Sequence, residues 1–373
     1  MSACRGCACT DLRRVLDLGN VPAADHFPSA AEPLSPNESS HPLAMDLCTV
    51  CGLAQLAEDD TVPDEPRGVE PQALRDQAAD AVKCVTDAGW LHGATVREFG
   101  SPHGGTWLPL LNQYGFVESE HASVVLDCFG IMHEPDQRSA FELRAAATAS
   151  DGVLLLQFHS LATIVARGQW NALRHGHFAY YSLTSLARLL DGAGMSVATA
   201  WEFDLYGGTV LVAAVHGRVE SDERVRKILQ REAKFGITEA AVVGRLQQSA
   251  DSHIAWLRNW LDTQAGARRQ VCGYGAASRA VALFSIAGID RRLLAAVADA
   301  SSAKQGCRMP ATDIPIISPE QLIEADPDSV LLTLPDLYEE VLQRYPQLDG
   351  RWMVDPGPEG DTLIPARYPR NRA

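Results

Sequence analysis

Two cysteine pairs, each separated by two residues, constrain this 373-residue chain more than any other feature of its sequence. Cys4 and Cys7 form the first pair, and Cys48 and Cys51 form the second. A Cys-x-x-Cys segment folds into a tight knuckle that points two thiolates at one ion, so two knuckles complete a tetrahedral zinc site. Cys9 is an alternative ligand, although its spacing from Cys7 is less suitable. Four protein ligands leave no open position, which predicts a structural zinc ion.

Composition indicates an ordinary globular protein in a reducing compartment. Hydrophobic residues make up 46% of the chain and charged residues 21%. The net charge of -15 disfavours binding to nucleic acid or to a membrane surface, so we expect neither partner. The first ten residues contain no apolar segment typical of a secretory signal. Metal-type cysteine spacing then favours a cytoplasmic protein.

Alternating strand and helix patterns predict an α/β fold with four segments. Residues 1–60 form a zinc-binding module, and residues 75–217 form a shortened Rossmann-like domain with strands near 94–100, 121–131 and 152–159. One long charged helix is expected to fill most of the connector, residues 218–264. Residues 265–373 begin with a strand, a glycine turn and a helix, and predict a second Rossmann-like domain.

Three blocks of sequence occur in an order that is typical of one enzyme family. The first block is CRGC…LRRVLDLGNVPAADHFP…HPLAMDLCTVCGLAQL, and the second is LRHGHFAYYSLTSLARLLDGAGMSV…LYGGTVLVAA. The third is VCGYGAASRAVALFSIAGI…VADASSAKQG…IPIISPEQL…SVLLTLP. Together they cover about two thirds of the chain and resemble the sugar C-methyltransferases, bacterial enzymes of deoxysugar and antibiotic pathways.

The resemblance implies a reaction and a division of labour between domains. In that family the middle domain is a Rossmann-like binder of S-adenosylmethionine (SAM). The C-terminal domain helps to hold a nucleotide-linked keto-sugar, and the reaction places a methyl group on the carbon next to the ketone. The implied partner is therefore a small keto compound, and the implied cofactors are structural zinc and SAM.

The candidate catalytic side chains lie mainly in the segment HGHFAYYS, residues 175–182. Methylation beside a ketone requires a base for the α-proton and a group that stabilises the enolate. His177 matches the family's base-type histidine and His175 matches its neighbour, whereas Gly176 replaces a family glutamate. His133, in GIMHEPD, matches a further family histidine. We expect His177 to be the base and His133 and Tyr180 to help with the enolate or with substrate placement.

The expected methyl-donor turn follows the first strand of the middle domain. Glu98, Gly100 and Gly104 stand in the family's pattern within VREFGSPHGGTW. A Rossmann-like site usually takes the ribose hydroxyls with an acid about 20 residues later, at the end of a second strand. Here the interval before residue 121 has room for only one short helix, although Glu118 or Glu120 approximates the acid. SAM is therefore either held by an abbreviated site or no longer bound, and the missing hydrogen bonds favour loss.

Further substrate contacts are expected in two places. In the middle domain they are Tyr181 and Tyr206, the latter in a Tyr-Gly-Gly-Thr turn that resembles the family's His-Gly-Gly-Ser turn. In the C-terminal domain a glycine turn opens a helix, a context that suits phosphate binding. Its candidate residues are Gly273, Tyr274, Gly275 and Arg279.

The sequence leaves three functional hypotheses. The first is SAM-dependent C-methylation of a keto substrate. The second is a repurposed enzyme that has lost SAM and uses the histidines in an epimerisation, elimination or cyclisation. The third is a non-catalytic partner of another biosynthetic enzyme. Retention of His133, His175 and His177 together argues against the third.

Overall fold

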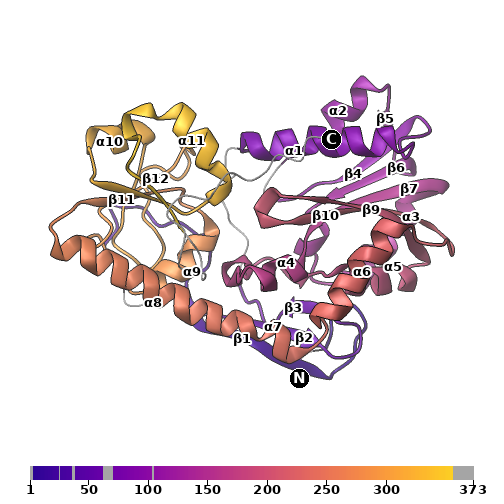
Figure 1. Cartoon of the computed structure of the whole chain (residues 1–373), viewed down its shortest axis with the longest axis horizontal. Helices are drawn as coiled ribbons and strands as arrows, with labels where there is room; N and C mark the ends of the chain where they lie inside the picture. The colour runs from indigo at the N-terminus through magenta and orange to yellow at the C-terminus, as the bar shows by residue number, and fades with distance from the viewer. Residues whose placement is uncertain (1–2, 25, 36–37, 62–69, 103–104, 356–373) are drawn as a thin grey trace. The chain divides into compact units, whose positions relative to one another are not determined.

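The computed structural model describes residues 3–24, 26–35, 38–61, 70–102 and 105–355 (Figure 1). The chain divides into two compact units. Unit 1 comprises Met1–Asn20, His41–Pro63 and Arg67–Gln247, and unit 2 comprises Val21–Ser40, Asp64–Pro66 and Gln248–Ala373. The segment between the two cysteine pairs therefore leaves unit 1 and returns to it.

A small sheet carries the cysteine pairs in unit 1. Its order is β1-β2-β3-β8, and β3 pairs antiparallel with both β2 and β8. The strands are β1 (Leu12–Val21), β2 (His41–Cys48), β3 (Ala54–Leu56) and β8 (Ala179–Tyr180). Because β8 comes from the segment with the candidate histidines, the cysteine module and this segment form one sheet.

The main sheet of unit 1 has the order β5-β4-β6-β7-β10-β9. The first four strands are parallel to one another, and β10 runs antiparallel to β7 and β9. The strands are β4 (Thr95–Phe99), β5 (Val117–Glu118), β6 (Ala122–Cys128), β7 (Thr148–His159), β9 (Met195–Phe203) and β10 (Thr209–His216). A two-residue strand, β5, thus occupies the interval in which the sequence predicted only a helix.

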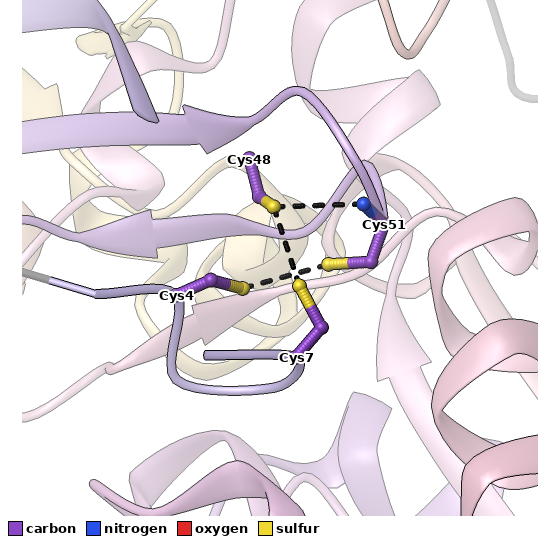
Figure 2. A group of neighbouring side chains, drawn as sticks. All are labelled: Cys4, Cys7, Cys48 and Cys51. Carbon is purple, nitrogen blue, oxygen red and sulfur yellow. Dashed lines mark hydrogen bonds between the residues drawn. The ribbon is translucent and has the colours of Figure 1, made fainter. Parts of the chain in front are cut away.

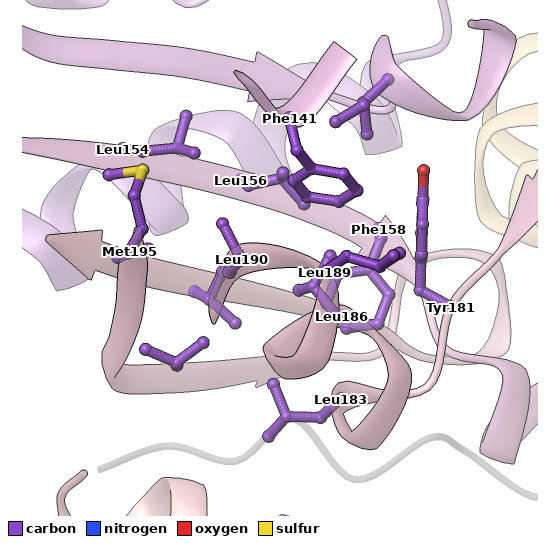
Figure 3. Close-up of a cluster of buried hydrophobic side chains, with 14 of the residues drawn as sticks. Phe141, Leu154, Leu156, Phe158, Tyr181, Leu183, Leu186, Leu189, Leu190 and Met195 are labelled. Atoms are coloured by element: carbon purple, nitrogen blue, oxygen red, sulfur yellow. The ribbon is translucent and has the colours of Figure 1, made fainter. Parts of the chain in front are cut away.

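Helices cover both faces of this sheet, because alternate residues of the central strands point to opposite sides. Leu154 and Leu156 of β7 pack with Phe141 and Leu186 in one core (Figure 3), whereas Leu155 belongs to the other. The surrounding helices and short 3-10 turns are α1 (Gln72–Asp87), α2 (Leu108–Gln113), η1 (Ile131–His133), α3 (Gln137–Ala147), α4 (Leu161–Ala166), η2 (Trp170–Ala172), α5 (Leu183–Gly192) and η3 (Leu205–Gly207).

The prediction of one long helix after residue 218 is wrong. Three helices occupy this region: α6 (Glu223–Phe235), α7 (Ala240–Val243) and α8 (Arg245–Gly266). Gly236 ends α6 in the left-handed conformation, with φ of 78°, which only glycine adopts without strain. Gly244 follows α7 and separates it from α8.

Unit 2 contains a five-stranded parallel sheet of order β13-β12-β11-β14-β15. The strand order reverses at β11, as in one half of a doubly wound fold. Its elements are β11 (Val271–Tyr274), α9 (Ser278–Ile286), β12 (Val297–Ala298), β13 (Ile316–Ile317), α10 (Pro319–Glu324), β14 (Ser329–Leu332), η4 (Pro335–Leu337), α11 (Tyr338–Arg344), η5 (Pro346–Leu348) and β15 (Trp352–Val354). The α/β class with two Rossmann-like sheets and a cysteine module is confirmed.

Within the described residues, no helix combines the length and the apolar character needed to cross a membrane.

Candidate zinc site and histidine cluster

Four cysteine sulfurs converge where the two knuckles meet (Figure 2). Cys4 Sγ lies 3.5 Å from Cys51 Sγ, and Cys7 Sγ lies 3.6 Å from Cys48 Sγ. A disulfide requires about 2.05 Å, whereas tetrahedral Zn–S bonds of about 2.3 Å place sulfurs about 3.8 Å apart. The four thiols therefore fit zinc, and Cys9, whose Sγ accepts a hydrogen bond from the Asp11 amide, lies outside the group.

The backbone of the second knuckle supports this geometry. The Cys51 amide donates to Cys48 Sγ at 3.5 Å, and Gly52 follows with φ of +76°. A Cβ at Gly52 would lie 2.9 Å from Cγ2 of Thr238, so both conformation and space require glycine here. A hydrogen bond from Cys51 lowers the pKa of the Cys4 thiol to about 5. Burial raises the pKa of the Cys7 thiol to about 11, and the hydrogen bond with Cys4 raises the pKa of the Cys51 thiol, so binding of zinc by all four thiolates would release protons.

Two of the three candidate histidines lie together. The rings of His133 and His177 meet edge to face, with centroids 4.4 Å apart and an interplanar angle of 83°. His133 lies in η1 after β6, and His177 is almost fully buried in the turn before β8. His133 Nδ1 donates to the Gly176 carbonyl at 2.9 Å, and the Phe178 amide donates to the Met132 carbonyl at 2.7 Å. Both loops are therefore joined on either side of the histidine pair.

Arg174 fixes the tautomer of His177 and was missed by the sequence prediction. Its Nε donates to His177 Nε2 at 2.7 Å. A guanidinium only donates, so Nε2 carries the lone pair of the neutral imidazole. For His133 the carbonyl of Gly176 only accepts, so Nδ1 carries its proton. The sequence did offer a signal for this contact, because Arg174 precedes His177 by three residues in the same short segment.

His175 contacts the cysteine module. Its Nε2 donates to the Pro42 carbonyl at 3.2 Å, and its ring lies 5.8 Å from that of His41. His41 in turn pairs with Asp60, at 2.7 Å between Nδ1 and Oδ1. Burial lowers the pKa of His175. This histidine therefore holds the turn against β2.

Both candidate tyrosines of this segment are buried. The Tyr180 hydroxyl donates to the Ala172 carbonyl and accepts from the Arg174 amide. The Tyr181 hydroxyl donates to Gln137 Oε1, and its ring packs against Phe141 and Phe158 (Figure 3). In this arrangement Tyr180 holds the turn that carries Arg174, and Tyr181 anchors the segment to α3.

A buried ion pair supports the loop of His133. Arg144 Nε donates to Asp127 Oδ2 at 2.9 Å, and both side chains are almost fully buried. Asp127 Oδ1 also accepts from the amides of Gly130 and Ile131. Breaking a buried pair of this kind costs about 3–5 kcal/mol, because one charge stays buried and unpaired. The residues after β6 are therefore held firmly.

The expected donor turn lies at the carboxyl end of β4. Glu98 accepts from the Trp107 amide at 2.7 Å and from the Thr106 hydroxyl at 2.5 Å, so its own loop uses both oxygens. Burial raises its pKa. Among the residues that the structure describes, a Cβ at Gly100 would meet nothing within 4 Å, which leaves room for close approach of a ligand to the backbone. Gly104 lies outside the described residues.

The part of the donor site that would bind the ribose is shorter than in a usual Rossmann-like site. Glu118 of β5 pairs with Val96 of β4, well before Phe99, where β4 ends. An acid that takes ribose hydroxyls belongs at the carboxyl edge of the sheet. The turn after β4 therefore fits the approach of a donor, whereas Glu118 does not reach the usual ribose position.

Tyr206 and Phe129 line the same edge of the sheet. Both have left-handed backbones, with φ of 55° and 63°, which costs about 1–3 kcal/mol in a non-glycine residue. Their rings lie edge to face, 5.9 Å between centroids. Phe129 was missed by the sequence prediction, because nothing local in CFGIMH indicates a left-handed residue after β6.

Side chains that follow β12 and β14 hold the glycine turn of unit 2. Gly275 has φ of +92°, and a Cβ there would lie 2.9 Å from the Thr333 hydroxyl. Asp299 accepts from the Ala276 amide at 2.8 Å, and buried Lys304 donates to the Ala276 carbonyl at 3.0 Å. A Cβ at Gly273 would lie 3.1 Å from Val297. The Tyr274 hydroxyl is buried against that of Tyr345, while Arg279, in the first turn of α9, is half-buried.

Two family models match the N-terminal and C-terminal parts of the chain, and one curated relative matches 95% of it. Residues 4–65 match the model described as "Putative zinc binding domain", and residues 204–355 match "C-methyltransferase C-terminal domain". The C-methyltransferase NovU of Streptomyces niveus is 26% identical to this chain in an alignment 405 residues long, which covers 95% of this chain and 95% of NovU. By these matches the chain carries the zinc-binding domain and the C-terminal domain of the C-methyltransferases. It is a methyltransferase-type enzyme, and its cysteine cluster is the zinc site of this family's N-terminal domain.

Two solved methyltransferases are similar to part of this C-methyltransferase. Magnesium protoporphyrin IX methyltransferase from Synechocystis is 12% identical and covers 41% of this chain and 90% of its own, with a TM-score of 0.29. A 1,6-didemethyltoxoflavin N1-methyltransferase from Burkholderia thailandensis is 13% identical and covers 44% and 96%, with a TM-score of 0.27. The family assignment depends on the sequence matches alone.

Proposed function

We propose that this enzyme transfers a methyl group from SAM to the carbon next to a ketone, on a nucleotide-linked keto-sugar of natural-product biosynthesis. The observation that carries the proposal is the contact between His133 and His177, with Arg174 bonded to His177 Nε2. A ketone needs a base and a cation or hydrogen-bond donor at its oxygen. One turn of this chain holds both kinds of group.

His177 is the proposed base. As a ketone oxygen approaches, it competes for the guanidinium of Arg174, which then leaves His177 Nε2. The C–H bond beside the ketone breaks, its proton goes to Nε2, and Arg174 stabilises the enolate oxygen. His133 holds the ring of His177 from its edge. SAM, when bound, supplies an electrophilic methyl group, and the turn after β4 with Gly100 would hold it.

In unit 1, the substrate contact proposed outside this turn is Tyr206, near the carboxyl ends of β6 and β7. In unit 2, described by itself, the glycine turn with Gly275 and Arg279 is proposed to bind a phosphate group. The test uses SAM with a labelled methyl group and a panel of nucleotide-linked keto-sugars. We expect label on the α-carbon of one panel member. We also expect Arg174→Met to reduce kcat by about 10²-fold or more, the size typical of losing an oxyanion donor.

A repurposed, non-methylating enzyme is the second candidate, and the short strand β5 favours it. If Glu118 leaves the ribose without its acid, the histidines can still exchange the α-proton. The two functions separate in D₂O. Deuterium uptake at the α-carbon without SAM, combined with no label transfer from SAM across the panel, supports the second function.

A further inference from the structure

Arg5 links the first cysteine knuckle to both histidine loops. It follows Cys4 directly, and its guanidinium makes hydrogen bonds in two directions. Nε and Nη2 donate to the Leu56 carbonyl, each at 3.3 Å, and Nη1 donates to the Pro135 carbonyl at 3.1 Å. The same group lies over the ring of Phe178, 4.7 Å from its centroid. One side chain thus contacts the residues beside His133 and beside His177.

The backbone of Arg5 is held as firmly as its side chain. Its amide donates to Oε1 of buried Gln55 at 2.9 Å, and its carbonyl accepts from the Arg138 amide at 3.4 Å. Gln55 belongs to β3, which pairs with β8 directly after the histidine turn. The Leu56 amide also donates to the Phe178 carbonyl at 3.2 Å. Arg5 therefore joins the knuckle, β3, η1 and the histidine turn.

The guanidinium of Arg5 donates to carbonyl oxygens, lies over an aromatic ring and interacts electrostatically with the carboxylate of Asp59. The planar guanidinium of arginine donates to two acceptors in fixed directions, whereas the ammonium of lysine is a single point charge without this fixed geometry. Truncation of Arg5 removes the bonds to Leu56 and Pro135 together but leaves all four thiols in place. The loops of His133 and His177 would then lose a common support.

We propose that Arg5 is a positioning residue that transmits the geometry of the zinc-loaded knuckle to the His133–His177 pair. The inference rests on the proposed function for its catalytic consequence, but its structural part can be measured without turnover. Zinc fixes Cys4 and Cys7, Arg5 lies between them, and the guanidinium sets the spacing of the two loops. Displacement of a catalytic group by about 1 Å is enough to cost about 10²-fold in rate.

The experiment compares Arg5→Met, Arg5→Lys and the control Arg13→Met, whose side chain is exposed and pairs with Asp11 in the same module. Zinc content is measured by mass spectrometry, and the imidazole nitrogens are observed by ¹⁵N NMR. We expect one zinc per chain in all three. The His133 and His177 resonances should move in Arg5→Met, move less in Arg5→Lys, and match those of a zinc-free sample, while His216 stays unchanged.

Unchanged His133 and His177 resonances in a zinc-loaded Arg5→Met protein would overturn the proposal. If that variant does not fold, the same comparison with Arg5→Lys decides. In turnover with labelled SAM, Arg5→Met should lower kcat about tenfold and change KM less than about threefold. Wild-type protein that transfers no label refutes the proposed function, and the NMR result still tests Arg5.

Discussion

His133 and His177 come from segments more than 40 residues apart, yet their rings meet edge to face at 4.4 Å. His177→Asn removes the proposed base and retains a side chain of similar shape. We expect kcat to fall about 10²–10⁴-fold, the usual contribution of a general base. His133→Asn should lower kcat less, because it removes the contact that holds the base. Turnover with labelled methyl donor measures both.

His216→Gln is the matched control, since its imidazole Nε2 bonds to the Thr148 carbonyl at the edge of the main sheet. Its activity should equal that of the wild type. Full activity in His177→Asn would remove His177 from the mechanism.

Zinc removal should destabilise the histidine turn as well as the knuckles, because β3 and β8 are paired. Structural zinc contributes on the order of 10 kcal/mol in isolated zinc modules. We expect chelation, or Cys48→Ser, to lower Tm by about 5 °C or more. Cys84→Ser, a half-buried thiol of α1 outside the cluster, should leave Tm nearly unchanged. Calorimetric melting curves with and without zinc decide, and equal Tm values would contradict a structural zinc.

Gly130→Ala tests the close approach between the loops after β4 and β6. A Cβ there would lie 3.0 Å from the carbonyl oxygens of Phe99 and Gly100 and from Asp127 Oδ1. Because backbone oxygens can move only slightly to make room for the added methyl group, we expect a loss of about 1–3 kcal/mol in the free energy of unfolding. Gly192→Ala is the control and should be neutral or stabilising, because Gly192 lies in a helix and no described residue lies within 4 Å of the added Cβ. Denaturant titration measures both, and equal stabilities would show that the loops separate easily.

Glu232 caps the start of α5 from a neighbouring helix. Its carboxylate accepts from the Leu183 and Thr184 amides and from the Thr184 hydroxyl. Glu232→Gln places an amide NH₂ against these donors, so we expect a loss of about 1–3 kcal/mol in unfolding free energy. Glu223→Gln, exposed on α6, should change it by less than about 0.5 kcal/mol.

The pH dependence of this effect has a defined sign. Burial raises the pKa of Glu232 above its ordinary value of 4.5, so the folded chain holds this proton more tightly than the unfolded chain. The stability from this group is full below 4.5 and is lost as the pH rises through the folded pKa. Gln does not titrate, so the deficit of Glu232→Gln should be larger at pH 4.5 than at pH 7. A constant deficit across this range would contradict the linkage.

Local patterns were sufficient to predict the knuckles, the α/β class, the strands near 94–100, 121–131 and 152–159, and the strand, glycine turn and helix that begin the C-terminal domain. They failed where distant segments decide the structure. Strand β8 is two residues long and pairs with β3, more than 120 residues earlier, so no periodicity could indicate it. Arg5 and Arg174 were visible beside Cys4 and before His177, but their acceptors come from other loops. The break in the predicted helix at Gly236 was available from the sequence, because a glycine there is a common C-cap signal.

Isothermal calorimetry of the zinc-loaded protein with SAM and with S-adenosylhomocysteine tests the central claim most directly. The turn after β4, with open space at Gly100, predicts heat of binding with about one site per chain for both ligands. A folded, zinc-loaded protein that gives no heat with either ligand would contradict methyl transfer from SAM, and the shortened strand β5 would then mark a lost donor site.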